Sequence, residues 1–102
     1  MDKDRECFIH DDKMNKFCLL PGAKHSNDFF EVGYTVDDCE LLKNDIKRQF
    51  NRKKAVDFVC LGDKEKFSIF MELGTDKKRR FRTVWEKKGE SGIPRFITAH
   101  RE

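Results

Sequence analysis

The sequence lacks the features that identify several classes of protein. Its four cysteines, at positions 7, 18, 39 and 60, form no C-x-x-C pair, so neither a redox dithiol nor a zinc knuckle is expected. The sequence contains no Gly-rich phosphate loop and no metal-ligand spacing, and we expect no cofactor and no metal. No apolar run approaches the ~20 residues of a membrane span, and the charged first residues contain no signal-peptide segment. These absences predict a cytoplasmic protein that does not contact a membrane.

The composition is that of one small domain with a polar surface. The chain has 102 residues, 37% of them hydrophobic and 40% charged, and its ten Phe supply most of the apolar area for a core. We expect a single domain over residues 1–102, with residues 1–6 frayed. The net charge of +3 comes from 22 basic and 19 acidic residues. This balance is too even to indicate nucleic-acid binding by itself.

The first half of the chain has helical patterns. Short helices are predicted over residues 13–20 and 26–32, the second of them ended by Gly33. A long helix is predicted over residues 35–50, because Thr35 suits the N-cap position and apolar residues then follow at steps of three and four. These apolar residues are Val36, Cys39, Leu42, Ile46 and Phe50.

The second half has the alternation of β-strands. Strands are predicted over residues 55–61, 67–73, 77–86 and 93–101, separated by turns that contain Gly. Residues 7–10 form a short apolar segment that suits an extra edge strand. The predicted fold class is therefore α+β, with N-terminal helices, including one long helix, packed on a four-stranded antiparallel β-meander.

The alternation also predicts which side chains leave the core. Phe81 and Trp85 face the helices, so Arg80 and Arg82 lie on the opposite, open face together with Phe70. The last strand allows two arrangements. If Ile97 faces the core, Thr98 and His100 join the two arginines; otherwise these two side chains turn inward.

That grouping has the chemistry of metal-independent RNA cleavage. His100 suits either proton-transfer role, Arg80 and Arg82 suit the phosphate, and Thr98 completes the candidate catalytic group. The alternative interpretation is that the arginines only solvate an exposed sheet face and that His100 is a surface residue. Further candidates for binding nucleic acid are Lys77, Lys78, Arg79, Phe96, Phe70 and His25.

Several motifs resemble a bacterial family of domains of unknown function, whose members occur alone and at the C-terminal ends of contact-dependent toxins. The resemblance covers about residues 13–101. The order of elements is also similar, at the level of the fold, to RelE and barnase-like ribonuclease toxins. The motifs are Lys16-Phe17-Cys18-Leu19-Leu20, His25, Phe29-Phe30, Gly33-Tyr34-Thr35, Asp38, Leu41-Leu42, Thr83-Val84-Trp85 and Pro94-Arg95-Phe96-Ile97-Thr98-Ala99-His100.

Two positions depart from the family pattern. Ser26-Asn27-Asp28 precedes Phe29 where the family commonly has a Lys, which removes one candidate phosphate contact. His100 stands where the last family motif usually ends in Tyr, so the resemblance does not give His100 a shared catalytic role.

Two functions remain open on these grounds. The first is a toxin-like ribonuclease that cleaves RNA through attack of the 2′-hydroxyl. The second is a non-enzymatic interaction protein, such as an inhibitor, an antitoxin-like protein or a phage–host defence factor. The partners would be RNA in the first case, with a cognate immunity protein, and a host or target protein in the second.

Overall fold

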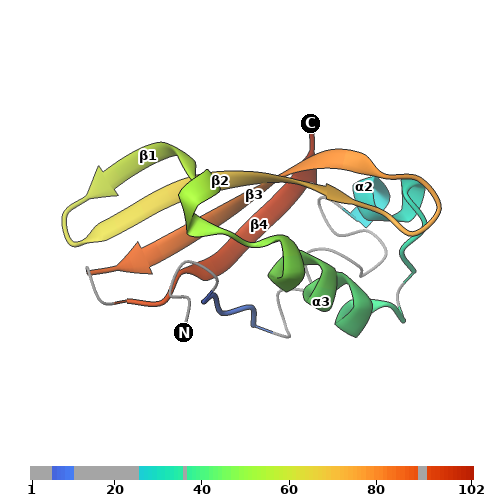
Figure 1. Ribbon diagram of the computed structural model, residues 1–102, viewed down its shortest axis with the longest axis horizontal. Coiled ribbons are helices and arrows are strands. Elements are labelled where there is room, and N and C mark those ends of the chain that lie inside the picture. Colours follow the sequence, from blue (N-terminus) through green and yellow to red (C-terminus); the bar gives the residue numbers. More distant parts are fainter. Residues whose placement is uncertain (1–5, 11–25, 36, 90–91) are drawn as a thin grey trace.

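A computed structural model describes residues 6–10, 26–35, 37–89 and 92–102. These residues form a four-stranded antiparallel sheet in the order β1-β2-β3-β4, with α3 along one face (Figure 1). None of the helices in this part of the chain has the length and apolarity needed to cross a membrane. The elements are α2 (Ser26–Glu31), α3 (Cys39–Gln49), the 3-10 turn η3 (Arg52–Lys54), β1 (Val56–Leu61), β2 (Lys64–Leu73), β3 (Arg79–Lys88) and β4 (Arg95–Arg101).

The predicted fold class is wrong in its helical part, because no long helix is present among the described residues. The helix expected over residues 35–50 covers only the eleven residues of α3. Thr35 does not cap it: the Asp38 carboxylate accepts hydrogen bonds from the backbone N–H and the hydroxyl of Thr35, at 2.7 and 3.1 Å, and holds a turn there. Phe50 is already extended, with ψ of 128°, and ends the helix. The helix predicted over residues 13–20 lies outside the described residues.

The sheet is a meander of consecutive strands. β2 and β3 pair without interruption from Lys64 opposite Lys88 to Leu73 opposite Arg79. Alternate residues of β3 are buried, as a sheet covered on one face requires. β2 follows the same alternation from Phe67 to Leu73, except that Ser68 is also buried. β2 begins three residues before the predicted position, directly after the turn at Gly62, whose φ of +66° favours glycine.

The core lies between α3 and the sheet, and Trp85 is at its centre. The indole is fully buried, with the ring of Phe50 at 4.5 Å and the ring of Phe96 at 5.5 Å, both edge-on. Its N–H donates to Thr83 Oγ1 at 2.8 Å, and the Thr83 hydroxyl donates to the Ile69 carbonyl at 2.7 Å. Every polar atom of this buried group therefore has a partner.

Polar contacts fix α3 on the sheet. The Gln49 side-chain amide donates to the Glu72 carbonyl at 2.5 Å and accepts from the Glu72 N–H at 3.0 Å. Tyr34 donates to Asp45 Oδ2 at 2.6 Å and accepts from the Gly74 N–H at 3.3 Å. Burial, with the hydrogen bond to Asp45, raises the pKa of Tyr34 well above its ordinary range. Both contacts hold the helix against the end of β2.

The two edges of the sheet differ. Along β4, Phe8 donates from its N–H to the Pro94 carbonyl at 2.8 Å and accepts from the Phe96 N–H at 2.9 Å. The extra edge strand expected over residues 7–10 is thus a single parallel bridge between Phe8 and Arg95. β1 is the other edge, and all six of its residues are exposed.

Candidate functional site

The side of the sheet turned away from α3 carries the candidate site, and we call it the open face. Its side chains on β3 are Arg80, Arg82, Val84, Glu86 and Lys88, which alternate with buried residues of the same strand. These positions span ~26 Å at the rise of a β-strand. The open face is therefore a long surface with the side chains of β3 along its middle.

Phe70 lies on β2 between two arginines of β3. The guanidinium carbon of Arg80 is 4.2 Å from the centroid of the Phe70 ring, and that of Arg82 is 5.6 Å from it. Phe70 pairs directly with Arg82 in the sheet. Cation–π attraction therefore holds both guanidinium groups along the open face.

Arg82 makes two further contacts that sequence analysis did not predict. Its Nε donates to Ser68 Oγ at 3.1 Å, and its Nη2 donates to Asp57 Oδ2 at 2.5 Å. Ser68 is on β2 and Asp57 is on β1, so the guanidinium extends across β2 toward the edge of the sheet. Asp57 has a φ of +56°, and the pairing of β1 with β2 is irregular between Val56 and Val59. Such a bulge redirects a side chain, and here it brings the carboxylate to Arg82.

The register of β4 decides the arrangement that the sequence left open. His100 is the partner of Arg82, and Thr98 is the partner of Val84. Both residues therefore share the open face with the arginines, since directly opposed residues point to the same side of a sheet. The pairing shifts between Val84 and Trp85, which leaves Ile97 as an extra, bulged residue.

The same bulge turns Phe96 inward. Thr98 is paired with Val84, but Phe96 is paired with Trp85 and is only 2% exposed. Phe96, a predicted candidate for binding nucleic acid, therefore does not lie on the open face, because its ring packs against Trp85 in the core. Strict alternation would have placed Phe96 beside Thr98, and the sequence carries no clear mark of the bulge.

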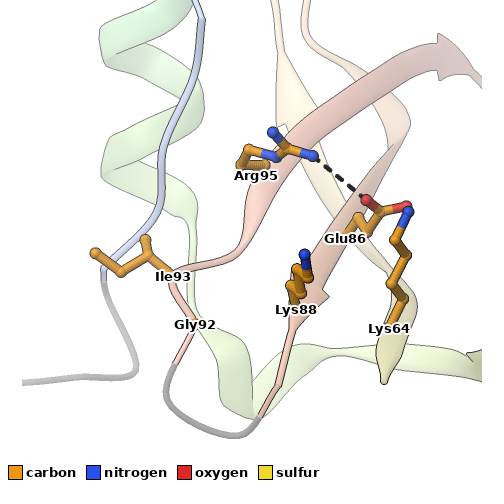
Figure 2. A pocket seen from close by; sticks show the side chains of 6 residues that line it. All are labelled: Lys64, Glu86, Lys88, Gly92, Ile93 and Arg95. Atoms are coloured by element: carbon orange, nitrogen blue, oxygen red, sulfur yellow. Dashed lines mark hydrogen bonds and ion pairs between the residues drawn. The ribbon is translucent and has the colours of Figure 1, made fainter. Parts of the chain in front are cut away.

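A basic pocket lies at the end of the open face nearest the β3–β4 connection (Figure 2). Its volume is about 380 Å³. Arg95 Nη2 is 3.4 Å from Glu86 Oε1, and the side chains of Lys88 and Lys64 lie beside this pair (Figure 2). The lining residues are Lys64, Glu86, Lys88, Gly92, Ile93 and Arg95. Three cations against one carboxylate make the pocket suitable for an anion such as phosphate.

A second hollow lies at the opposite end of the sheet, where β3 begins and β4 ends. It has a volume of about 310 Å³ and is lined by Arg79, Arg80, Arg101 and Glu102. Lys77 and Lys78 are exposed in the adjoining β2–β3 turn. The predicted nucleic-acid-binding residues at positions 77–79 are thus divided: Lys77 and Lys78 lie in a turn, and Arg79 begins β3 beside the hollow.

The structure therefore places all four residues of the predicted catalytic group on one face of the sheet and separates other candidates from them. Arg80, Arg82, Thr98 and His100 share one face, and Phe70 lies among them. His25 lies outside the described residues. No group of His, Cys, Asp and Glu that suits a metal ion occurs among the residues that the structure describes. The arrangement presents cations, one aromatic ring and one imidazole, a combination suited to a single-stranded nucleic acid.

Comparison with known proteins gives a family but no described activity. No curated protein and no solved structure matches the chain. One family model matches residues 5–102, and its description is that of a domain of unknown function, DUF6883. Since this match covers nearly the whole chain, the protein belongs to the DUF6883 family.

Proposed function

We propose that the open face binds single-stranded RNA and cleaves it without a metal ion. The observation that carries this proposal is the position of His100 directly opposite Arg82, with Phe70 on the neighbouring strand. An imidazole beside an arginine and an aromatic ring supplies a proton acceptor, a phosphate ligand and a surface on which a base stacks. Three elements of an RNA-cleaving site are thus adjacent on one face.

In the proposed reaction the 2′-oxygen bonds to phosphorus, and the bond from phosphorus to the 5′-oxygen breaks. His100 takes the proton of the 2′-hydroxyl, and water supplies the proton that the leaving 5′-oxygen takes up. Arg82 and Arg80 stabilise the negative charge that develops on the phosphoryl oxygens. Asp57 is not assigned a proton-transfer role, because the three strand spacings from β1 to β4 place it ~14 Å from His100 along the sheet.

Arg82 must change partner for this role. Its Nη2 is occupied by Asp57, so a phosphate has to compete with that carboxylate. The ion pair is largely exposed, with 57% of the Asp57 side chain accessible, and exposed pairs contribute only ~0–1 kcal/mol. A phosphate group that contacts more than one cation can therefore displace Asp57. Arg80, which stacks on Phe70, supplies a second cation at the same place.

The basic pocket extends this proposal to a longer substrate. Lys64, Lys88 and Arg95 line it at the far end of the same face, four to six residues along β3 from Arg82. We assign it to a phosphate further along the same RNA strand. Together with the family resemblance to toxin-associated domains, this supports a toxin-like ribonuclease that acts on cytoplasmic RNA and has a cognate immunity protein as partner.

The test is incubation of the purified protein with a mixed RNA pool, with and without a chelator. We expect cleavage in both conditions, products ending in 2′,3′-cyclic phosphate, and no cleavage of a 2′-deoxy substrate. His100→Ala should lower the rate by ~10²–10⁴, the contribution of a positioned acid or base. His10→Ala is the matched control, because His10 is exposed and lies on the segment beside the β4 edge rather than on the open face. Intact RNA with the folded wild-type protein would overturn the proposal.

The non-enzymatic alternative has one observation in its favour. Arg82 already has two protein partners, Ser68 and Asp57, which is what a purely structural arginine shows. In that case the open face binds an acidic protein surface without turnover. RNA that stays intact, together with a stable protein partner recovered on this face and released by Arg80→Ala, would support this function.

A further inference from the structure

The outer edge of β1 is exposed and apolar. Val56, Phe58, Val59 and Leu61 are between 39% and 55% exposed, although all four are large hydrophobic residues. Soluble proteins usually protect an edge strand with Lys, Pro, a bulge or a charged side chain. β1 contains neither Lys nor Pro, and its bulge and its one charged residue lie near its start, which leaves residues 59–61 as a regular exposed strand. Its outer side pairs with no other strand in the described part of the chain.

The opposite edge of the sheet, formed by β4, is protected, in contrast to the edge formed by β1. The segment around Phe8 covers the start of β4, through two backbone hydrogen bonds. At the other end of that strand, the Arg101 N–H donates to Oδ2 of Asp28, a residue of α2, at 3.2 Å. Among the residues that the structure describes, the fold therefore covers the β4 edge of the sheet and leaves the β1 edge without a neighbouring strand.

The charges on the strands indicate which partner fits β1. Its only charged residue is Asp57, and Arg82 neutralises that carboxylate from within the same sheet. β3 and β4, in contrast, contain several arginines. A charged peptide would place ionic groups against exposed Phe58 and Val59, whereas an apolar, uncharged strand would not. Among the strands of this protein, β1 itself has that composition.

We propose that β1 is the interface through which two copies of this chain associate, by antiparallel pairing of β1 with β1. Such pairing sets apolar side chains opposite apolar side chains, and the one charged residue of each β1, Asp57, is already neutralised by Arg82 of its own copy. It also closes by two-fold symmetry, so no further strand can add at this edge. Each copy would complete the backbone hydrogen bonds that the other leaves open.

The symmetry fixes how the two open faces are related. Antiparallel pairing of equivalent edge strands requires a two-fold axis perpendicular to the sheet. Both open faces then lie on the same side of one continuous sheet, and both α3 helices lie on the other. Asp57 and its partner Arg82 come near the dimer axis. The inference does not depend on RNA cleavage, because it is based on the edge strand alone.

Sedimentation equilibrium at protein concentrations from ~1 µM to ~1 mM tests this inference. A dimer held together by one six-residue strand from each copy should dissociate on dilution. We expect the average mass of the wild-type protein to rise toward two chains at high concentration. Val59→Lys should stay monomeric, because pairing would bring one cation from each copy close together near the axis. Leu41→Lys is the matched control, since Leu41 is similarly exposed but lies on α3, and it should associate like the wild type.

Hydrogen exchange of the wild-type protein gives a second measurement that needs no variant. The β1 amides that face outward should become protected as the concentration rises, whereas α3 amides should exchange at an unchanged rate. A wild-type protein that stays monomeric at ~1 mM, or equal association of Val59→Lys and Leu41→Lys, would overturn the inference. A wild-type protein that associates but does not cleave RNA would refute the proposed function and leave this inference standing.

Discussion

Asp57 and Arg82 form a hydrogen-bonded ion pair across an intervening strand, with 2.5 Å between Oδ2 and Nη2. The carboxylate lies on the edge strand β1 and the arginine on β3, so the guanidinium crosses β2 and contacts Ser68 on the way. This contact determines which way the central cation of the open face points. In the free protein it points toward β1, and His100 lies on its other side.

Asp57→Asn should therefore release Arg82 for a phosphate. We expect the affinity for single-stranded RNA to rise ~1.5- to 5-fold. This factor corresponds to the ~0.2–1 kcal/mol that an exposed ion pair contributes and that the phosphate no longer has to overcome. Asn is chosen because it tolerates the positive φ of +56° at this position. Fluorescence anisotropy with a labelled oligonucleotide at fixed salt measures the change.

Asp37→Asn is the control for that measurement, because it removes the same charge from an exposed position before α3. A general charge effect would raise the affinity for RNA equally in both variants. Specific competition between Asp57 and the phosphate for Arg82 would raise it only in Asp57→Asn. No change in either variant would mean that Arg82 does not contact the RNA.

The basic pocket of Figure 2 gives a second prediction. Lys88→Ala should weaken RNA binding for all sequences alike and lower the salt dependence, with the slope of log K against log salt reduced by about one. Lys47→Ala on α3 is the control and should leave both quantities unchanged, because Lys47 is exposed on the opposite side of the sheet. For an RNA too short to reach from Arg82 to the pocket, Lys88→Ala and the wild type should have the same affinity.

Strand positions and the faces of β3 could be predicted from the sequence, because burial of one sheet face imposes a period of two. The sequence of β3 follows that period without interruption, so Trp85 and Phe81 were assigned to the core and Arg80 and Arg82 to the other face. The structure agrees at each of these four positions.

The remaining features depend on local backbone choices that periodicity does not encode. A bulge at Ile97 separates the faces of Phe96 and Thr98, and another before Val59 turns Asp57 toward Arg82. α3 begins at Cys39 and not at residue 35 as predicted. The reason is that the Asp38 carboxylate accepts hydrogen bonds from Thr35 and makes no side-chain hydrogen bond to the start of the helix. In each case a side-chain hydrogen bond or an extra residue competes with the regular pattern of a helix or strand. The periodicity of one sequence does not give the relative free energies of the two arrangements.

The packing of α3 can be tested by stability measurements. Ile46 is fully buried beneath the sheet, so Ile46→Ala should lower the free energy of unfolding by ~2–5 kcal/mol through the cavity it leaves. Lys47→Ala, one position along the same helix, should change it by no more than ~0.5 kcal/mol. Urea denaturation followed by Trp85 fluorescence measures both. Similar small effects at the two positions would contradict the observed orientation of α3.

The cysteines give a prediction about pH. Burial raises the pKa of Cys7 from its ordinary value near 9 to about 11, whereas Cys60 is exposed on β1. Iodoacetamide at pH 8.5 should therefore label Cys60 much faster than Cys7 in the native protein, since the thiolate is the reacting form. Mapping of the labelled peptides by mass spectrometry measures the two rates, and the unfolded chain, in which both should react alike, is the control.

The same pKa shift should appear in the stability of the protein. Below pH 9 the Cys7 thiol is protonated in both the folded and the unfolded chain, so it contributes no pH dependence. Between about pH 9 and about pH 11 only the unfolded chain loses this proton, and the free energy of unfolding should fall as the pH rises. Other groups also titrate there, and the informative quantity is therefore the difference between wild type and Cys7→Ala. The decline should be shallower in Cys7→Ala than in the wild type. Identical slopes for the two proteins would show that Cys7 ionises as freely in the folded chain as in the unfolded one.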